Sequence, residues 1–533
     1  MKSWNLQKIK NSIQSNQYLP YLALMLITLL LYTCSPIYIN ERGNVDIDTS
    51  FAVSNAMRHG YVLGRDIFEQ RGLYFYFLIL PSTLFDTFHF QLLWIWIIEV
   101  LSTFVAYYNI KPILGKRNAL IAIILYILLI NTDDIGEPDF LIMAINGFLM
   151  RIALTNTNLS KKYTLILGLI LGFLIEFKFA LIIPTCAIFL VFGLKMLWNK
   201  QFKQFFETVL IAVIGLLLAQ IPMLIYTLTT GSLHDYMLAY FIENVGNAHF
   251  YIFRFIKIVL TFLFDNMFII LILAVPFHIG LKQFHKFNQI AFITLFSLEI
   301  LRIIGVGFYT AYYNNALIFF ASVIAMKGLI AILAKTSTTN SKLYKSIKYA
   351  SLIILTSLCI SVTYSIYNHI QVNELNTSSK KVGEYIKQNG QGDVLTYASL
   401  DFMQYIYSQT YPTVRYFDQT NISYRNRPQS FNAQLSYIKN KRTRWVTQMV
   451  DHGYKDMYRY ADVYQEFIRY NRKLFVLKTF DGPSRPFKCY VPKVLIKNYD
   501  PVFVATDYNR DSEGYQQAKT ILWERKKKAQ INL

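Results

Sequence analysis

The sequence Val45–Tyr76, VDIDTSFAVSNAMRHGYVLGRDIFEQRGLYFY, decides how the rest of this chain is interpreted. It follows the first long apolar run, is too polar to cross a bilayer, and is too apolar for an ordinary solvated loop. Its carboxylates and cations stand among aromatic residues. A charged segment wedged between membrane-spanning runs indicates a functional site. Its role depends on the side of the membrane that it faces, which the remaining sequence predicts.

The composition is that of a polytopic membrane protein with a polar tail. Of 533 residues, 54% are hydrophobic, and long apolar runs recur through the first two-thirds of the chain. The formal net charge of +21 suits a protein among anionic lipids or polymers, and no nucleic-acid-binding motif accompanies it. The four cysteines lack the spacing of a zinc site or a disulfide framework. A basic leader precedes Tyr18–Ile39, an apolar run without a cleavage site, which predicts a signal anchor.

Apolar runs predict eleven membrane-spanning helices, with the N-terminus in the cytoplasm. They cover residues 19–39, 88–110, 117–132, 138–154, 162–177, 179–198, 205–229, 265–281, 288–306, 312–334 and 347–368. Every short inner loop is then basic, and outer loops such as Asn131–Asp139 are acidic, as the positive-inside rule requires. One long kinked span over 162–198 is the alternative, but the basic loops downstream argue against it. Val45–Tyr76 therefore falls in a first outer loop, residues 40–87.

The first outer loop and the tail are predicted to fold outside the membrane. In the loop we expect two short helices, Ser50–His59 and Gly72–Phe85. Beyond a transmembrane domain of residues 1–368, we expect an extracytoplasmic α/β domain of residues 369–533 with 26 Lys and Arg against 15 Asp and Glu. Its β-rich runs are Gly392–Ala398, Thr413–Phe417, Arg444–Met449, Leu474–Thr479, Val502–Thr506 and Thr520–Glu524. Its helix-like segments are Ser378–Gln388, Ser399–Gln409 and Pro428–Lys439.

Two carboxylates, Asp46 and Asp48, follow the first span directly. Carboxylates at this spacing suit a metal clamp for a phosphate, or one general base with an electrostatic partner. The structural alternative is a polar loop in which Asp48-Thr49-Ser50 caps the 50–59 helix. The charged residues Arg65, Asp66, Glu69 and Arg71 form a second cluster, for which a salt-bridged loop anchor is the structural alternative.

Further candidates stand at the predicted outer ends of the spans. Glu137 and Asp139 open a span, where an acidic first turn also serves capping. Lys178 lies among apolar residues and needs a partner or a phosphate. Its structural alternative is an ion pair with Glu176 or a side chain that extends to the lipid headgroups. Arg302 stands one helical turn after Glu299, and an ion pair between them is its structural alternative.

This arrangement resembles the GT-C glycosyltransferases of the protein O-mannosyltransferase and aminoarabinose-transferase group (family 39) and related bacterial wall-polymer enzymes. Their pattern is D-S/T, about ten residues to a Gly, then Y-x-D-x-F-E/D-x-K/R-G-P. Asp48-Thr49, Gly60 and Gly64–Gly72 (GRDIFEQRG) match it, with Leu73 in place of the Pro and Gln70 where His is common. Four later stretches are also similar to the group: Gly136-Glu137, Gly168–Lys178, Gly307–Leu317 (with Tyr313 but without the His), and Gly392–Leu395 through Arg415-Tyr416.

The resemblance implies a polytopic helical GT-C fold and inverting transfer of a sugar from a polyprenyl-phosphate donor to an extracytoplasmic acceptor. It implies Asp48 as general base, with Asp46 as its partner or substitute. Lys178, Arg302, Arg65 and Arg71 are the residues implied at the donor phosphate, and Asp66, Glu69, Glu137, Asp139 and Tyr313 those that orient the substrates. The D-x-D form of Asp46-Ile47-Asp48 allows Mg²⁺ or Mn²⁺, although several related enzymes work without a metal.

The basic tail favours an anionic glycopolymer acceptor, such as teichoic acid or capsular polysaccharide, at a bacterial cell membrane. A lipid-linked-sugar flippase or transporter is the alternative from another class; it predicts charges deep in mid-span and broken helices in matched halves, neither of which is seen in the sequence. A non-catalytic scaffold for wall-polymer assembly is a third option, and it predicts that Asp48 is dispensable.

Overall fold

The computed structural model describes residues 18–33, 38, 45–69, 71–85, 87–129, 141–242, 252–265, 267–305, 311–339, 345–346, 349, 378–397, 402–418, 424–425, 427–449, 458–481, 486–508 and 516–526. The predicted span 347–368 lies outside these residues, apart from position 349. The chain divides into two compact units. The first comprises Met1–Pro36, Ile95–Pro222 and His249–His369, and the second comprises Ile37–Trp94, Met223–Ala248 and Ile370–Leu533.

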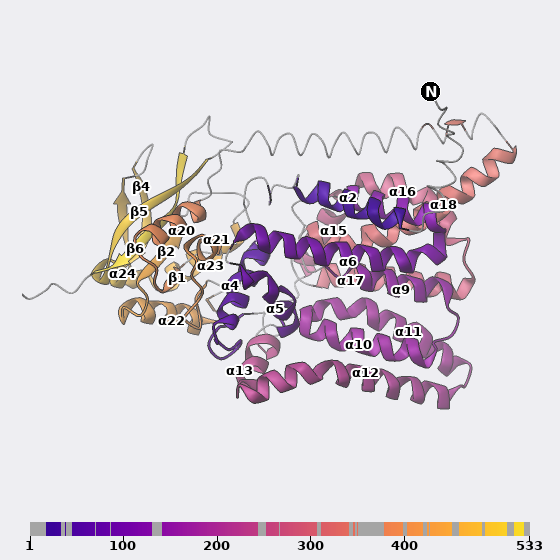
Figure 1. Ribbon diagram of the computed structural model, residues 1–533, viewed down its shortest axis with the longest axis horizontal. Coiled ribbons are helices and arrows are strands. Elements are labelled where there is room, and N and C mark those ends of the chain that lie inside the picture. The colour runs from indigo at the N-terminus through magenta and orange to yellow at the C-terminus, as the bar shows by residue number, and fades with distance from the viewer. Residues whose placement is uncertain are drawn as a thin grey trace, which may run out of the picture. The chain divides into compact units, whose positions relative to one another are not determined.

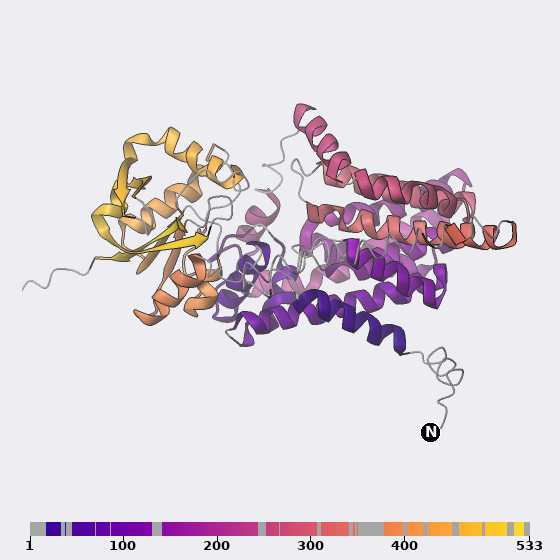
Figure 2. The same ribbon diagram turned by 90° about the horizontal axis from the view of Figure 1, so that it is seen from above.

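Apolar helices build the first unit. Their bounds are α2 Leu19–Thr33, α6 Phe88–Leu114, α7 Lys116–Leu129, α9 Met143–Thr155, α10 Lys161–Lys178, α11 Ile183–Trp198, α12 Phe202–Thr229, α15 Ile252–Asp265, α16 Met267–Leu281, α17 Lys286–Gly305 and α18 Asn315–Thr339. Most of them run side by side in Figure 1 and Figure 2. A helix satisfies its own backbone hydrogen bonds, which apolar surroundings require. Four described stretches are long and apolar enough to span a bilayer: Phe88–Leu114, Lys161–Trp198, Phe202–Thr229 and Asn315–Ser337. The predicted total of eleven membrane-spanning helices therefore remains a prediction.

The stretch Lys161–Trp198 contains two helices. After α10 the backbone at Lys178 is extended, with φ −161° and ψ 99°, and a short 3₁₀ helix η3 (Phe179–Ile182) leads into α11. Gly168 packs on the backbone of Ala212, and Gly172 packs on Leu216, one turn later in α12. This matching order means that α10 and α12 run parallel. Because α11 returns the chain from the end of α10 to the start of α12, it runs the opposite way, which removes the single kinked span as an alternative.

A mixed sheet forms the centre of the tail in the second unit (Figure 1). Its strand order is β1-β2-β6-β5, where β1 Val394–Tyr397 pairs in parallel with β2 Trp445–Met449 and the other pairs are antiparallel. The inner strand β6 covers Gln516–Arg525, and the edge strand β5 covers Tyr499–Tyr508. A separate hairpin consists of β3 Phe475–Phe480 and β4 Phe487–Pro492. The helices of the tail are α20 Ser378–Gln388, α21 Met403–Ser408, α22 Pro428–Lys439, α23 Tyr458–Tyr470 and α24 Lys493–Asn498.

The prediction for Thr413–Phe417 was wrong, because this segment is irregular. Its backbone carbonyls accept single hydrogen bonds in two directions. Arg415 O accepts from the N–H of Phe68 at 2.8 Å, and Phe417 O accepts from the N–H of Thr396 in β1 at 2.9 Å. The segment is thereby tied to the first loop and to the sheet without forming a ladder with either. The sequence also failed to indicate β4, α23 and α24.

Two short helical segments form in the first loop, as the sequence predicts, but with different bounds. α4 covers Val45–Arg58, so it begins five residues before the predicted Ser50. Asp48 consequently lies inside the first turn and is not the cap of the helix. The second segment is α5 Leu73–Ile79, followed by the 3₁₀ helix η1 Leu80–Leu84. A third piece of this unit, α13 Leu233–Met237 with the π-helical turn η4 Leu238–Ile242, packs against the loop.

Candidate active site

In α4, residues Ile47–Ala56 are all buried although many of them are polar. Its apolar residues Phe51 and Val53 are at most 1% exposed, and Asp48 is 2% exposed. The polar side chains Thr49, Ser50, Ser54 and Asn55 are also buried. The helix packs against α5, η1 and α21 of the same unit. Buried polar groups need hydrogen-bond partners. Ser50 donates to the carbonyl of Ile47 at 2.6 Å, and Ser54 donates to that of Tyr76 at 3.2 Å. The burial of Asp48 shows that the first turn of α4 holds a carboxylate in a defined place.

The loop that follows α4 makes a tight turn through two glycines. Gly60 and Gly64 have φ of +90° and +85°, which disfavours residues with a Cβ. The Gly64 N–H donates to the carbonyl of Ile67 at 2.8 Å, and the Asp66 N–H donates to the carbonyl of Val62 at 2.8 Å. The turn places the Arg65 and Asp66 side chains next to each other.

Arg65 and Asp66 form a two-pronged ion pair. Arg65 Nε and one terminal nitrogen donate to the two carboxylate oxygens of Asp66 at 3.0 and 2.9 Å, and the other terminal nitrogen donates to the carbonyl of Thr230 at 2.9 Å. The Val62 N–H also donates to Asp66 at 2.9 Å. The pKa of Asp66 is lowered by the hydrogen bond from Arg65, against a smaller rise from burial, so the carboxylate stays ionised at neutral pH.

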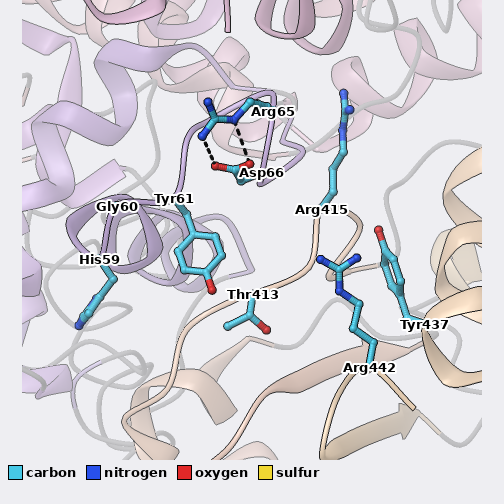
Figure 3. A pocket seen from close by; sticks show the side chains of 9 residues that line it. All are labelled: His59, Gly60, Tyr61, Arg65, Asp66, Thr413, Arg415, Tyr437 and Arg442. Carbon is cyan, nitrogen blue, oxygen red and sulfur yellow. Dashed lines mark hydrogen bonds and ion pairs between the residues drawn. The ribbon is translucent and has the colours of Figure 1, made fainter. Parts of the chain in front are cut away.

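A cleft of about 530 Å³ opens beside this ion pair. One part of its lining comes from the first loop and the other from the tail domain, as Figure 3 shows. Arg415 belongs to the irregular segment described above and lies 3.4 Å from the carboxylate of Asp235. The guanidinium of Arg442 lies 5.2 Å from the centre of the Tyr437 ring. The full lining is His59, Gly60, Tyr61, Arg65, Asp66, Thr413, Arg415, Tyr437 and Arg442.

A buried arginine joins the same loop to the tail. Arg427 is 1% exposed, and its guanidinium carbon lies 3.2 Å from the centre of the Phe68 ring and 5.2 Å from that of Tyr416. Burial, with Glu69 as a second cause, raises the pKa of Asp418 well above its ordinary value, and Arg427 opposes this rise. Stacking of a desolvated guanidinium on an aromatic ring is worth about 2 kcal/mol or more.

In the first unit, two predicted cations, Lys178 and Arg302, lie over the ring of a third predicted site residue, Tyr313. The Lys178 ammonium lies 4.9 Å from the centre of the Tyr313 ring, and the Arg302 guanidinium lies 5.4 Å from it. Lys178 is the last residue of α10, Arg302 belongs to α17, and Tyr313 belongs to the 3₁₀ helix η5 Ala311–Asn314. Arg302 also pairs with Glu299 at 2.6 Å and donates to the carbonyl of Tyr313 at 3.2 Å. The ion pair expected as the structural alternative is thus present beside a second cation.

The other predicted residues fall into separate places. Arg71 lies 3.5 Å from Glu69 and over the Phe75 ring at 5.4 Å. Asp46 is in the first turn of α4, but its side chain is outside the described part of the structure. Glu137 and Asp139 also lie outside the described residues. Asp48, Arg65 and Arg71 belong to the second unit, whereas Lys178, Arg302 and Tyr313 belong to the first. Among the described residues, no three His, Cys, Asp or Glu side chains are placed to hold a metal ion.

Solved structures share this architecture over nearly the whole chain. ArnT from Cupriavidus metallidurans bound to undecaprenyl phosphate matches 90% of this chain and 99% of its own, at 11% identity and a TM-score of 0.55. The archaeal oligosaccharyltransferase AglB from Archaeoglobus fulgidus, in complex with an inhibitory peptide and a dolichol-phosphate, matches 92% of this chain and 80% of its own, at 12% identity and a TM-score of 0.52. The chain has the GT-C fold. No protein-family model and no curated protein sequence matches it.

The fold that the resemblance implied is confirmed by these structures. No motif or spacing in the sequence selected Thr413, Tyr437 or Arg442 as site residues. Arg415 had entered only as part of a stretch similar to other tail domains. The local sequence around Arg442 offers only the basic run Lys441–Arg444 as an indication of a binding site. Basic runs are equally common on solvent-exposed surfaces without a binding function. The place of these cleft residues depends on contacts between segments more than 300 residues apart, such as the bond from Phe68 to Arg415.

Proposed function

We propose that this protein is an integral-membrane glycosyltransferase that moves a sugar from a polyprenyl-phosphate donor to an acceptor outside the cytoplasm. The observation that carries this proposal is the GT-C fold, which 90% of this chain shares with ArnT from Cupriavidus metallidurans bound to undecaprenyl phosphate. The two cations around Tyr313 support it, because a lipid phosphate needs positive charge as it leaves. Lys178 and Arg302 are the proposed contacts to that phosphate, and Arg302 also pairs with Glu299.

In the proposed reaction, Asp48 takes the proton of an acceptor hydroxyl while the hydroxyl oxygen attacks the anomeric carbon from the face opposite the phosphate. The bond between the anomeric carbon and the phosphate oxygen breaks, and the polyprenyl phosphate leaves with the electron pair. The configuration at the anomeric carbon of the transferred sugar is therefore inverted. Asp48 suits the role of base because it is held inside a buried helical turn, which limits its positions. Asp46 is its proposed partner.

The proposed acceptor is an anionic surface glycopolymer such as teichoic acid or capsular polysaccharide, and a hexose is the proposed transferred group. The excess of positive charge in residues 369–533 supports this choice. The proposal places the first loop and the tail outside a bacterial cell membrane, because the inner loops of the predicted topology are basic. Arg71 remains a proposed donor contact, and Asp66, Glu69, Glu137, Asp139 and Tyr313 remain proposed substrate contacts. Arg65, the other expected donor contact, donates to Asp66 and Thr230 through all its side-chain nitrogens, so its proposed role is to hold Asp66 in place.

The test is transfer by the purified full-length protein in nanodiscs. Labelled polyprenyl-phosphate sugars are offered with wall polymer, and wild type is compared with Asp48→Asn and Asp46→Asn. We expect Asp48→Asn to lower kcat by about 10²- to 10⁴-fold, as loss of a general base does. Donor binding and the unfolding temperature are measured on the same samples. Asp481→Asn, an exposed change in the same unit, is the matched control.

The outcomes separate the competing functions. Full activity in both variants would remove the base assignment. A wild-type protein that transfers no sugar but moves the lipid-linked sugar across the bilayer would be a flippase. A protein that does neither, yet is required for polymer assembly, would be a scaffold. The same reactions with EDTA, followed by Mg²⁺ or Mn²⁺, ask whether a divalent metal at Asp46 and Asp48 takes part.

A further inference from the structure

The cleft beside the Arg65–Asp66 pair has the composition of a binding site for a charged saccharide. Three arginines and one aspartate line it, so its side chains carry an excess of positive charge. Its volume of about 530 Å³ is within the usual range of ligand sites. The cleft is formed by two segments of one unit, the first loop and the tail domain. Neither segment alone supplies it.

The arginines of the cleft differ in how far they are already engaged. Arg65 donates to Asp66 twice and to Thr230 once, so its terminal nitrogens and Nε all have partners within the chain. Arg415 has a longer contact with Asp235, at 3.4 Å, and its Nε makes no hydrogen bond with any described residue. Arg442 is exposed. Arg415 and Arg442 are therefore the cations available to bind an anion. Arg65 and Asp66 are bonded to each other and form the side of the cleft.

Aromatic side chains stand on both sides of these cations. Tyr437 lies beneath the guanidinium of Arg442, and Tyr61 faces the cleft from the first loop in Figure 3. Tyr61 is supported by Tyr411, whose ring lies 5.7 Å away and stacks on His59 at 4.1 Å. Burial raises the pKa of both Tyr61 and Tyr437, so both hydroxyls stay protonated and able to donate at neutral pH. Flat amphipathic rings beside cations suit a sugar that carries a phosphate or a carboxylate.

We infer that this cleft binds the anionic group of the acceptor saccharide, with Arg442 and Arg415 as its principal contacts. The inference rests on the proposed transferase function and adds a location for its acceptor. A polyprenyl phosphate would bring the same phosphate chemistry, but it also brings a long apolar chain. The lining of the cleft is dominated by arginine, aspartate, threonine, tyrosine and histidine, which offers no apolar surface of that length. The acceptor is therefore the better fit.

The experiment measures binding to the full-length protein in zwitterionic nanodiscs. The probe is a fluorescent hexamer of glycerol phosphate, and maltohexaose with the same label is the neutral probe. Arg442→Gln is expected to weaken binding of the anionic probe about 2- to 5-fold, which is what an exposed charge contributes. Binding of that probe should also weaken with added salt. Arg472→Gln, which removes the same charge from an exposed position outside the cleft, is the control and should leave the affinity unchanged.

Three results would overturn the inference. Equal losses in Arg442→Gln and Arg472→Gln would mean that the probe responds to the general charge of the tail. Equal affinity for the neutral probe would remove the role of the anion. Competition between undecaprenyl phosphate and the anionic probe would assign the cleft to the donor. Arg415→Gln is the second variant, and its unfolding temperature shows whether loss of the Asp235 contact has also disturbed the fold.

A transfer assay separates this inference from the proposed function. If the protein is a transferase and the cleft holds the acceptor, Arg442→Gln should raise the KM for the anionic acceptor about 2- to 5-fold with little change in kcat. A lowered kcat with unchanged KM would count against an acceptor contact. If wild type transfers no sugar but still binds the anionic probe through Arg442, the proposed function fails while the binding site stands.

Discussion

Replacing Gly64 by alanine tests how the first loop is held. A Cβ added at Gly64 would lie 2.7 Å from the Cα and 2.8 Å from the backbone nitrogen of Tyr236. A left-handed backbone costs a residue with a Cβ about 1–2 kcal/mol, and forcing a methyl group against packed atoms costs about 1–3 kcal/mol more. We expect Gly64→Ala to lower the free energy of unfolding by about 2–5 kcal/mol.

Gly60→Ala is the matched control. Gly60 has nearly the same backbone strain, with φ +90°, but a Cβ added there would have no atom within 4 Å. Its cost should be the conformational term alone, about 1–2 kcal/mol. The difference between the two variants, about 1–3 kcal/mol, then measures the contact with Tyr236.

Tryptophan fluorescence during denaturation of the protein in nanodiscs is the assay. Trp445 and Trp523 are at most 1% exposed and belong to the same unit as the loop, so their emission reports its unfolding. Binding of the anionic probe is measured in parallel, because a displaced loop should also lose cleft affinity. Equal destabilisation by Gly60→Ala and Gly64→Ala would refute the close packing of the loop on Tyr236.

Three further changes give separate tests. Glu299→Gln should lower stability by about 3–5 kcal/mol, because Arg302 would be left buried without its carboxylate; an unchanged melting temperature would contradict this. Arg427→Met removes a guanidinium 3.2 Å from the Phe68 ring and should cost about 2 kcal/mol or more, measured by proteolysis of the loop; wild-type resistance would argue against it. The pKa of Asp66 is lowered below 3.8, so its pairing with Arg65 stabilises the fold above that pH and is lost as the pH falls through the lowered pKa. Melting temperatures of Asp66→Asn should therefore depend less on pH than those of wild type below about pH 4.

Local patterns predicted the parts of the tail that local forces determine. The helices α20 and α22 have the bounds that the sequence predicted, Ser378–Gln388 and Pro428–Lys439. In α22 the proline at the first helical position and the apolar spacing act within a few residues of each other. Five predicted β-runs also became strands, among them Val394–Tyr397, whose four residues are all buried. The local sequence of each of these elements is therefore sufficient to predict it.

The cleft and the irregular segment depend on distant parts of the chain, which a local pattern does not encode. Thr413–Phe417 has the composition of a strand, but its carbonyls bond to Phe68 and to Thr396, so it is held between two partners. Asp48 was selected because it matches a motif. Its burial could not be predicted, because it depends on the packing of α4 against the distant helix α21. Whether Asp48 is the base remains a prediction for the transfer assay.

The second unit is assembled from three separate pieces of chain, and this has a consequence for biogenesis. The first loop leaves the ribosome early, whereas its partner Arg415 is made about 350 residues after Phe68. At roughly 5–20 residues per second, the two are separated by roughly 20–70 s of synthesis. During this interval the nascent loop exposes apolar surface such as Phe68 that the finished protein buries. A chain whose translation stops before the tail would leave that surface uncovered, which makes it a target for chaperones and proteases during membrane insertion.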